Sequence, residues 1–161
     1  MENTLSGVDN GKEWTYTGST LKGKRHGYGT CTWTFPDERI AVYAGEWISN
    51  RMHGMGKYTG YTGNIHEGGF ASDGVHGNAK GIYSNGDVYD GEYTNDMRHG
   101  KGKYTFANGD IAEGEFAEGY LYKGKVTFKS TGEVYEGELA VGKGVLTSGH
   151  RHPQITLEYF A

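Results

Sequence analysis

The stretch Tyr89–Ile111, YDGEYTNDMRHGKGKYTFANGDI, contains two runs in which rings or glycines alternate with polar residues. Strand side chains point to alternate faces, so one face of the first run carries Tyr89, Gly91 and Tyr93. The second run follows a polar loop at 95–100 and has the same alternation. Asn108-Gly109 then predicts a tight hairpin turn, because both residues tolerate positive φ. The unit therefore reads as strand, loop, strand, turn.

The unit recurs along the chain at intervals of 23 residues, with an earlier and longer copy in front. Its first positions are Tyr16, Tyr43, His66, Tyr89, Ala112 and Tyr135. Two kinds of recurring position are expected to be structural. The first is a glycine two residues after the start: Gly45, Gly68, Gly91, Gly114 and Gly137. The second is the histidine of a His-Gly pair: His26, His53, His76 and His99. Self-similarity at a fixed period indicates a repeat architecture.

At these positions the chain resembles the MORN repeat, whose motif is Tyr-x-Gly-x-aromatic followed by Gly-x-x-His-Gly-x-Gly. The resemblance covers about residues 14–146. We expect six copies, at about 16–42, 43–65, 66–88, 89–111, 112–134 and 135–146. A polar N-terminal lead-in, 1–13, precedes the array, and a C-terminal tail or cap, 147–161, follows it.

Composition agrees with a β-array. The chain has 161 residues, of which 29 are glycine and 35% are hydrophobic, and its 13 tyrosines, 6 phenylalanines and 3 tryptophans recur at fixed distances from the glycines. We find no stretch with the apolar spacing of a long helix. The predicted fold is all-β: an elongated, twisted, single-layer antiparallel β-meander of tandem hairpins, counted as one domain.

A pairing register follows if the turn of each unit lies in the middle of its polar loop. Rings then face glycines across the hairpin, with Tyr93 opposite Gly102 and Trp47 opposite Gly56. A ring lying over a glycine covers backbone and fixes the register of a glycine-rich sheet. The same register sets Glu92 opposite Lys103 on the other face, which reads as a solvated surface of acids, lysines and threonines.

Net charge and cysteine content argue against several classes of function. A net charge of −4 argues against nucleic acid and disfavours anionic lipid, since both need a basic face. Cys31 is the single cysteine, so no disulfide can form within the chain. The polar start is not a secretory signal, and no run is long and apolar enough to span a membrane. A cytoplasmic location is expected.

The recurring histidines and carboxylates do not predict a metal site or a catalytic site. Equivalent positions two strands apart lie about 9.5–10 Å from each other, too far to share one metal ion. The carboxylates recur on the solvated face in every unit, which favours a polar surface over a pair of catalytic acids. We therefore predict no enzyme activity, cofactor or metal.

The resemblance implies an accessory or scaffold module, as in proteins of cytoskeletal and ciliary assemblies. We expect the chain to bind a protein partner, either an amphipathic helix or a second copy of itself, through a trough lined by rings. The candidate residues are Trp47, Tyr58, Phe70, Tyr83, Tyr89, Tyr93, Tyr104, Phe106 and Phe116, with Trp47, Phe70, Tyr93 and Phe116 as its floor. Three alternatives stay open: binding through the acidic face or a sheet end, a peripheral phosphoinositide-binding module, and an accessory subunit of a larger enzyme complex.

Overall fold

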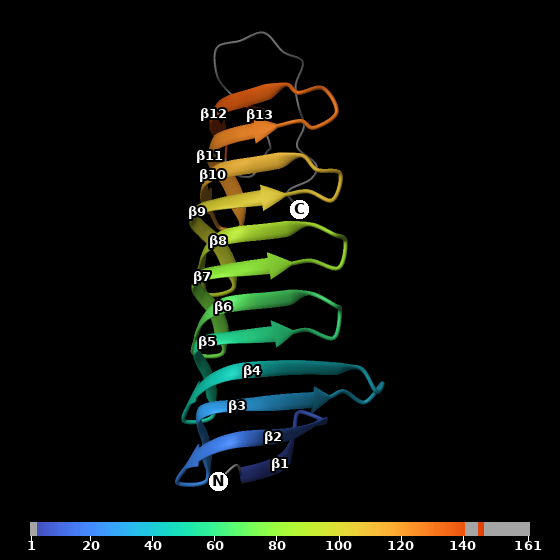
Figure 1. Cartoon of the computed structure of the whole chain (residues 1–161), viewed down its shortest axis with the longest axis vertical. Coiled ribbons are helices and arrows are strands. Elements are labelled where there is room, and N and C mark those ends of the chain that lie inside the picture. The colour runs from blue at the N-terminus through green and yellow to red at the C-terminus, as the bar shows by residue number, and fades with distance from the viewer. Residues whose placement is uncertain (1–2, 141–144, 147–161) are drawn as a thin grey trace.

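The chain folds as one meandering antiparallel sheet. The structure is a computed structural model that describes residues 3–140 and 145–146, so the expected tail at 147–161 lies outside it. The described residues form a 13-stranded sheet without helices, in which each strand pairs with the next along the chain. Figure 1 shows the resulting elongated array, from β1 at the bottom to β12 at the top. The all-β meander predicted from the sequence is confirmed.

The strands β1 to β12 have 7 to 11 residues each, and β13 has 2. Their bounds are β1 (Asn3–Asp9), β2 (Lys12–Leu21), β3 (Lys24–Thr34), β4 (Ile40–Ile48), β5 (Arg51–Thr59), β6 (Ile65–Ala71), β7 (Gly74–Ile82), β8 (Val88–Thr94), β9 (Met97–Thr105), β10 (Ile111–Ala117), β11 (Tyr120–Thr127), β12 (Val134–Ala140) and β13 (Val145–Leu146). The expected lead-in therefore contains a strand, since β1 pairs with β2 over its whole length.

Tight turns close the hairpins within the units. Asn95 and Asp96, which join β8 to β9, have φ angles of 49° and 67°. Positive φ at both central residues is the signature of a type I′ turn, whose twist matches the flanking strands. The sequence suggested that the polar stretch 95–100 is a loop. That prediction is wrong, because β9 already begins at Met97.

The turns between units are of a different kind. At Asn108-Gly109 only the glycine has positive φ, 89°. The Gly109 N–H donates to the Phe106 carbonyl at 2.8 Å, and the Phe106 N–H donates to the Asp110 carbonyl at 2.9 Å. This is a type I turn followed by a glycine bulge. The hairpin predicted at this site is present, but the prediction of positive φ at both residues is wrong.

Each His-Gly pair lies in a β-bulge. Between β8 and β9, Gly91 pairs with Gly102 but Tyr93 pairs with Arg98, so β9 contains two extra residues. Gly100 has φ 62°, and a Cβ there would lie 2.7 Å from a Glu92 carboxylate oxygen. That carboxylate accepts the Lys101 N–H at 3.0 Å, as Glu46 accepts the Met55 N–H in the second unit. These two bulges combine a glycine in the left-handed region with a carboxylate acceptor opposite it, whereas the bulge of the third unit has Gly69 in place of the acceptor.

The bulge shifts the register that the sequence predicted. Tyr93 does not face Gly102, and Trp47 faces Met52 rather than Gly56. On the opposite face, Lys103 pairs with Asp90 instead of Glu92. The predicted register is wrong by two residues. The turn lies at the start of the polar stretch, and the remaining residues of that stretch form the bulge.

A row of glycines, interrupted once by an alanine, crosses the sheet from β2 to β12, and each residue lies directly opposite the next. It consists of Gly18, Gly29, Gly45, Gly56, Gly68, Ala79, Gly91, Gly102, Gly114, Gly124 and Gly137. We call it the glycine ladder. A Cβ built on Gly102 would overlap the ring of Tyr89, whose hydroxyl donates to the Glu92 carbonyl at 3.1 Å. Ring-on-glycine packing is therefore present, but the ring belongs to the first position of the unit.

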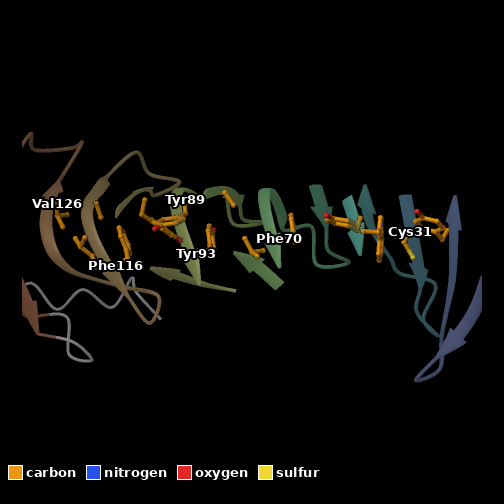
Figure 2. Packing of buried hydrophobic residues seen from close by; sticks show 14 residues of the cluster. Cys31, Phe70, Tyr89, Tyr93, Phe116 and Val126 are labelled. Carbon is orange, nitrogen blue, oxygen red and sulfur yellow. The ribbon is translucent and has the colours of Figure 1, made fainter. Parts of the chain in front are cut away.

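First-position rings, which we call lead rings, alternate with the aromatic residues four positions later, which we call second rings. Tyr43 contacts Trp47 edge-on, with centroids 5.1 Å apart, and contacts Phe70 of the next unit at 4.9 Å. Tyr89 contacts Tyr93 at 5.1 Å and Phe116 at 5.0 Å in the same way. Figure 2 shows the buried side chains as a row along the array. Each edge-to-face pair contributes about 0.5–1.5 kcal/mol beyond the area it buries.

Hydrogen bonds join each unit to the next at both ends of the strands. At the type I′ turns, Asp73 Oδ1 accepts the Met52 N–H at 2.9 Å and Asp96 Oδ1 accepts the Val75 N–H at 2.8 Å. At the other end, Asp110 Oδ1 accepts the Lys129 N–H at 2.9 Å. Contacts of this kind, between neighbouring units only, are typical of a linear array.

We predict that Gly102→Ala destabilises the array by about 1–3 kcal/mol, the range for overpacking, because the new methyl group must displace the Tyr89 ring. Urea unfolding followed by circular dichroism measures the loss. Lys103→Ala, the exposed neighbour on the opposite face, is the control and should stay within about 0.5 kcal/mol of wild type. Equal midpoints for Gly102→Ala and wild type would contradict the packing of Tyr89 on the ladder.

We also predict that Glu92→Ala costs about 1 kcal/mol of stability, because it removes the acceptor for the Lys101 N–H in the bulge. Glu92→Gln keeps a carbonyl oxygen at the same place and should lose less. The same urea titration compares the two variants. If alanine and glutamine cost the same, the bulge does not depend on that acceptor.

Candidate binding groove

The face of the sheet that carries the rings, here called the ring face, is hollowed in two places. The first hollow has a volume of about 350 Å³. Half-buried rings of Trp33 and Tyr58 form part of its wall, and the buried side chain of Phe70 adds to its apolar lining. The exposed residues Asp73 and Asp96, from the type I′ turns, lie at the same hollow. It is an apolar site with two carboxylates beside it, within the size range of ligand sites.

The second hollow, of about 500 Å³, lies further along the array. Tyr83, Tyr104 and Arg98 line it, and Asp96 belongs to both hollows. The guanidinium carbon of Arg98 is 4.8 Å from the centroid of Tyr104, so a side chain of the chain itself covers that ring. The two hollows meet at Asp96, and we refer to them together as the ring-face groove.

His66 occupies the first position of its unit, where the neighbouring units have tyrosine. Its imidazole meets the rings of Tyr83 and Tyr93 edge-on, with centroids 6.0 and 5.8 Å away. Burial lowers the pKa of His66, while the charge of Asp96 acts in the opposite direction. Because burial is the larger cause, the imidazole in the groove wall is held neutral at neutral pH.

Only part of the predicted trough is open to a partner. The four rings expected to form its floor are 1–4% exposed, because other rings of the array cover them: Trp47, Phe70, Tyr93 and Phe116. Phe70 still reaches the first hollow. Replacing Trp47 or Tyr93 would therefore test the fold rather than binding.

The other predicted ring residues divide in a similar way. Tyr89 is fully buried, and Phe106 is half-buried against Tyr104, with centroids 4.8 Å apart. Tyr58 lines the first hollow, and Tyr83 and Tyr104 line the second. Whether these side chains bind a partner stays a prediction.

The histidines of the His-Gly pairs are not brought together. His53, His76 and His99 are exposed, and His26 is half-buried. Their backbone lies at the bulges, as the register shift beside Glu46 shows for His53, whose carbonyl accepts a hydrogen bond from the Tyr43 hydroxyl at 3.2 Å. In the described part of the chain, no three His, Cys, Asp or Glu side chains are placed to hold a metal.

The opposite face, here called the outer face, carries a ladder of alternating charges. Its rungs are Lys57, Glu67, Lys80, Asp90, Lys103, Glu113, Lys125 and Glu136, each directly opposite the next. Lys125 and Glu113 form an ion pair at 2.7 Å, and Lys57 and Glu67 one at 3.7 Å. The alternating signs agree with the mixed surface of acids and lysines expected from the sequence, and they make this ladder neither an acidic nor a basic surface.

Sequence reasoning missed the residues that shape the first hollow. Met52 and Val75 each precede a His-Gly pair, and Asp73 and Asp96 each end a type I′ turn. The available signal was the variation at these two positions of the unit: the other units have arginine or leucine at the first and asparagine or glycine at the second. It could not be interpreted without knowing that these positions meet on the ring face.

Comparison with known proteins agrees with the repeat structure. The family model of the MORN repeat matches residues 16–34, 43–65 and 89–111. A search of curated proteins found no match. The count of six copies stays a prediction, although 66–88 and 112–134 also contain paired strands of the same sheet. No helix in the described residues could cross a membrane.

The lowered pKa of His66 predicts a pH dependence of stability. An unfolded histidine titrates near pH 6.5, so acid protonates the unfolded chain before the buried imidazole. The stability contributed by neutral His66 is therefore present above that pH and is lost as the pH falls below it. Thermal unfolding at about pH 7.5 and about pH 5.5 should show a larger loss for wild type than for His66→Phe. Equal losses in the two proteins would contradict a buried neutral imidazole.

Proposed function

We propose that this chain, which carries MORN repeats, is a non-enzymatic module that binds a protein partner along its ring-face groove. MORN repeats form a family of protein- and membrane-binding modules and are not an enzyme family. The observation that carries the proposal is the first hollow, where Trp33 and Tyr58 keep part of their rings open beside two carboxylates. Aromatic residues that are partly covered and held rigidly are typical anchors of protein interfaces.

The shape of the groove supports a segment of a partner as the ligand. The two hollows follow each other along the array and share Asp96, so an extended or helical segment can contact several units at once. Grooves of this type bind apolar side chains at regular intervals and orient the segment through polar groups at the rim. Cytoskeletal and ciliary assemblies of the cytoplasm, the setting that the family resemblance implies, are where we propose to look for this partner.

Charge favours protein over lipid as the partner. The net charge is −4, the outer face alternates in sign, and the first hollow is flanked by carboxylates. Binding to anionic lipid headgroups depends on clustered lysines and arginines.

A matched pair of neighbouring substitutions tests the groove. Tyr58→Ser removes a ring from the first hollow, and Lys57→Ala changes the adjacent residue, which is exposed on the outer face. The tagged wild-type chain and both variants, each checked for folding by circular dichroism, are used to capture partners, which mass spectrometry then quantifies. We expect Tyr58→Ser to lose at least about tenfold of the main captured protein, as for a binding hot spot, and Lys57→Ala to retain it. Loss with Lys57→Ala alone would place binding on the outer face instead.

A further inference from the structure

The residue before each His-Gly pair, which we call the cap residue, lies over the ring face beside a second ring. It is Arg25 in the first unit, then Met52, Val75 and Arg98 in the next three. Met52 is directly opposite Trp47 in its hairpin, and Arg98 is directly opposite Tyr93. One position of the unit thus decides whether the rings beneath it are covered by a charged or by an apolar side chain.

Both arginine caps make the same two kinds of contact. The Arg25 guanidinium carbon is 4.5 Å from the Trp47 centroid, and its Nη2 donates to the Asn50 carbonyl at 3.1 Å. Arg98 stacks over Tyr104, and its Nε donates to the Gly119 carbonyl at 3.1 Å. Asn50 and Gly119 are corresponding residues in the type I′ turn of the following unit. A guanidinium over rings, bonded to the next turn, is therefore a recurring element of this array.

The two units in between lack that element. Met52 and Val75 keep the backbone hydrogen bonds to the next turn, to Asp73 Oδ1 and Asp96 Oδ1, but their side chains are shorter and carry no donor. The first hollow opens there, over Trp33, Tyr58 and Phe70. The turn residues differ as well: neutral Asn50 and Gly119 beside the arginine caps, aspartates beside the apolar caps. Among the described residues neither aspartate has a cation within ion-pair distance.

We propose that the first hollow receives an arginine side chain of the partner protein, in the place that Arg25 and Arg98 occupy in the flanking units. This inference rests on the proposed function and specifies its ligand. The guanidinium stacks on the half-buried rings of Trp33 and Tyr58 and donates to the carboxylates of Asp73 and Asp96. Arginine suits the site better than lysine, because its planar group stacks on rings and presents five donors in a fixed fork.

The electrostatics of the hollow favour a cation. Burial raises the pKa of Tyr58, and the negative charge of Asp96 raises it further. Burial lowers the pKa of His66, and the charge of Asp96 opposes that shift. The field of Asp96 therefore reaches both walls of the hollow. His66 is neutral at neutral pH and does not repel a guanidinium. The cation that does line the hollow, Lys12, lies over the Phe35 ring at 5.3 Å.

Two peptides of one sequence test the proposal. An acetylated, amidated peptide with one central arginine between apolar residues is compared with the same peptide carrying citrulline, which has the shape of arginine but no charge. Binding to the ¹⁵N-labelled full chain is followed by amide chemical shifts. We expect the arginine peptide to shift resonances around Met52, Tyr58 and Val75 and to bind at least about tenfold more tightly, as for a hydrogen bond to a charged group.

Substitutions in the chain locate the effect. Asp73→Asn combined with Asp96→Asn should remove the preference for arginine, whereas Asp90→Asn on the outer face should keep it. Met52→Arg places an internal guanidinium in the hollow, and we expect it to abolish binding of the arginine peptide and to raise the melting temperature. If Met52→Arg does not fold, the variant with both aspartates replaced still tests whether the hollow prefers arginine.

Each result separates this inference from the proposed function. Equal binding of the two peptides in the hollow would overturn the arginine site and leave the groove as a binding site. No shifts in the hollow at millimolar arginine peptide would also overturn it, whatever the partner capture with Tyr58→Ser shows. Loss of captured partner with Lys57→Ala and not with Tyr58→Ser would overturn the proposed function itself.

Discussion

The packing of one tyrosine ring against two glycines sets most of this structure. Tyr89 lies over Gly91 and Gly102, and its hydroxyl reaches the carbonyl of Glu92 in the bulge. The contact fixes the register, because a shift would bring a Cβ under the ring. It also buries the lead rings completely, although the described residues form a single layer: Tyr16, Tyr43 and Tyr89 are 0% exposed. In the unit that begins with His66, the ladder contains Ala79 instead of glycine. The imidazole ring, smaller than that of tyrosine, thus occurs together with a ladder residue larger than glycine.

Alternation allowed the sequence to predict the fold, but local geometry decided which residues are exposed. The 23-residue period and the pairing of rings with glycines indicated a meander, and the meander is present. Two features were not visible in that pattern. The bulge at Gly100 depends on a carboxylate acceptor across the hairpin, and the type I′ turn depends on positive φ at Asn95, a residue that many turns contain. Together they moved the register by two residues and changed which ring each glycine meets.

The same limit applies to the groove. Parity correctly placed Tyr58, Tyr83 and Tyr104 on the ring face, but it could not tell covered rings from open ones. Cover comes from side chains of neighbouring units, such as Phe70 on Tyr43, and from a cap residue nine positions after the start of the unit. Such contacts appear only once the unit-to-unit stacking is known. The sequence therefore indicated the face on which we propose binding, whereas the place of the hollows on that face required the structure.

Variation between units then acquires a physical meaning. The glycine ladder, the lead rings and the turn hydrogen bonds recur along the array with few exceptions, such as Ala79 in the ladder and Ala112 at a first position. They hold each unit against its neighbours. The cap residue is less constrained, because its carbonyl accepts an N–H of the next turn whether the residue is Arg98 or Val75. An arginine there closes the ring face with a cation–π contact, and a shorter apolar residue opens it. One side chain per unit can thus distinguish positions along the array without any change of fold, and the site that we propose for a partner lies where the chain does not cover its own rings.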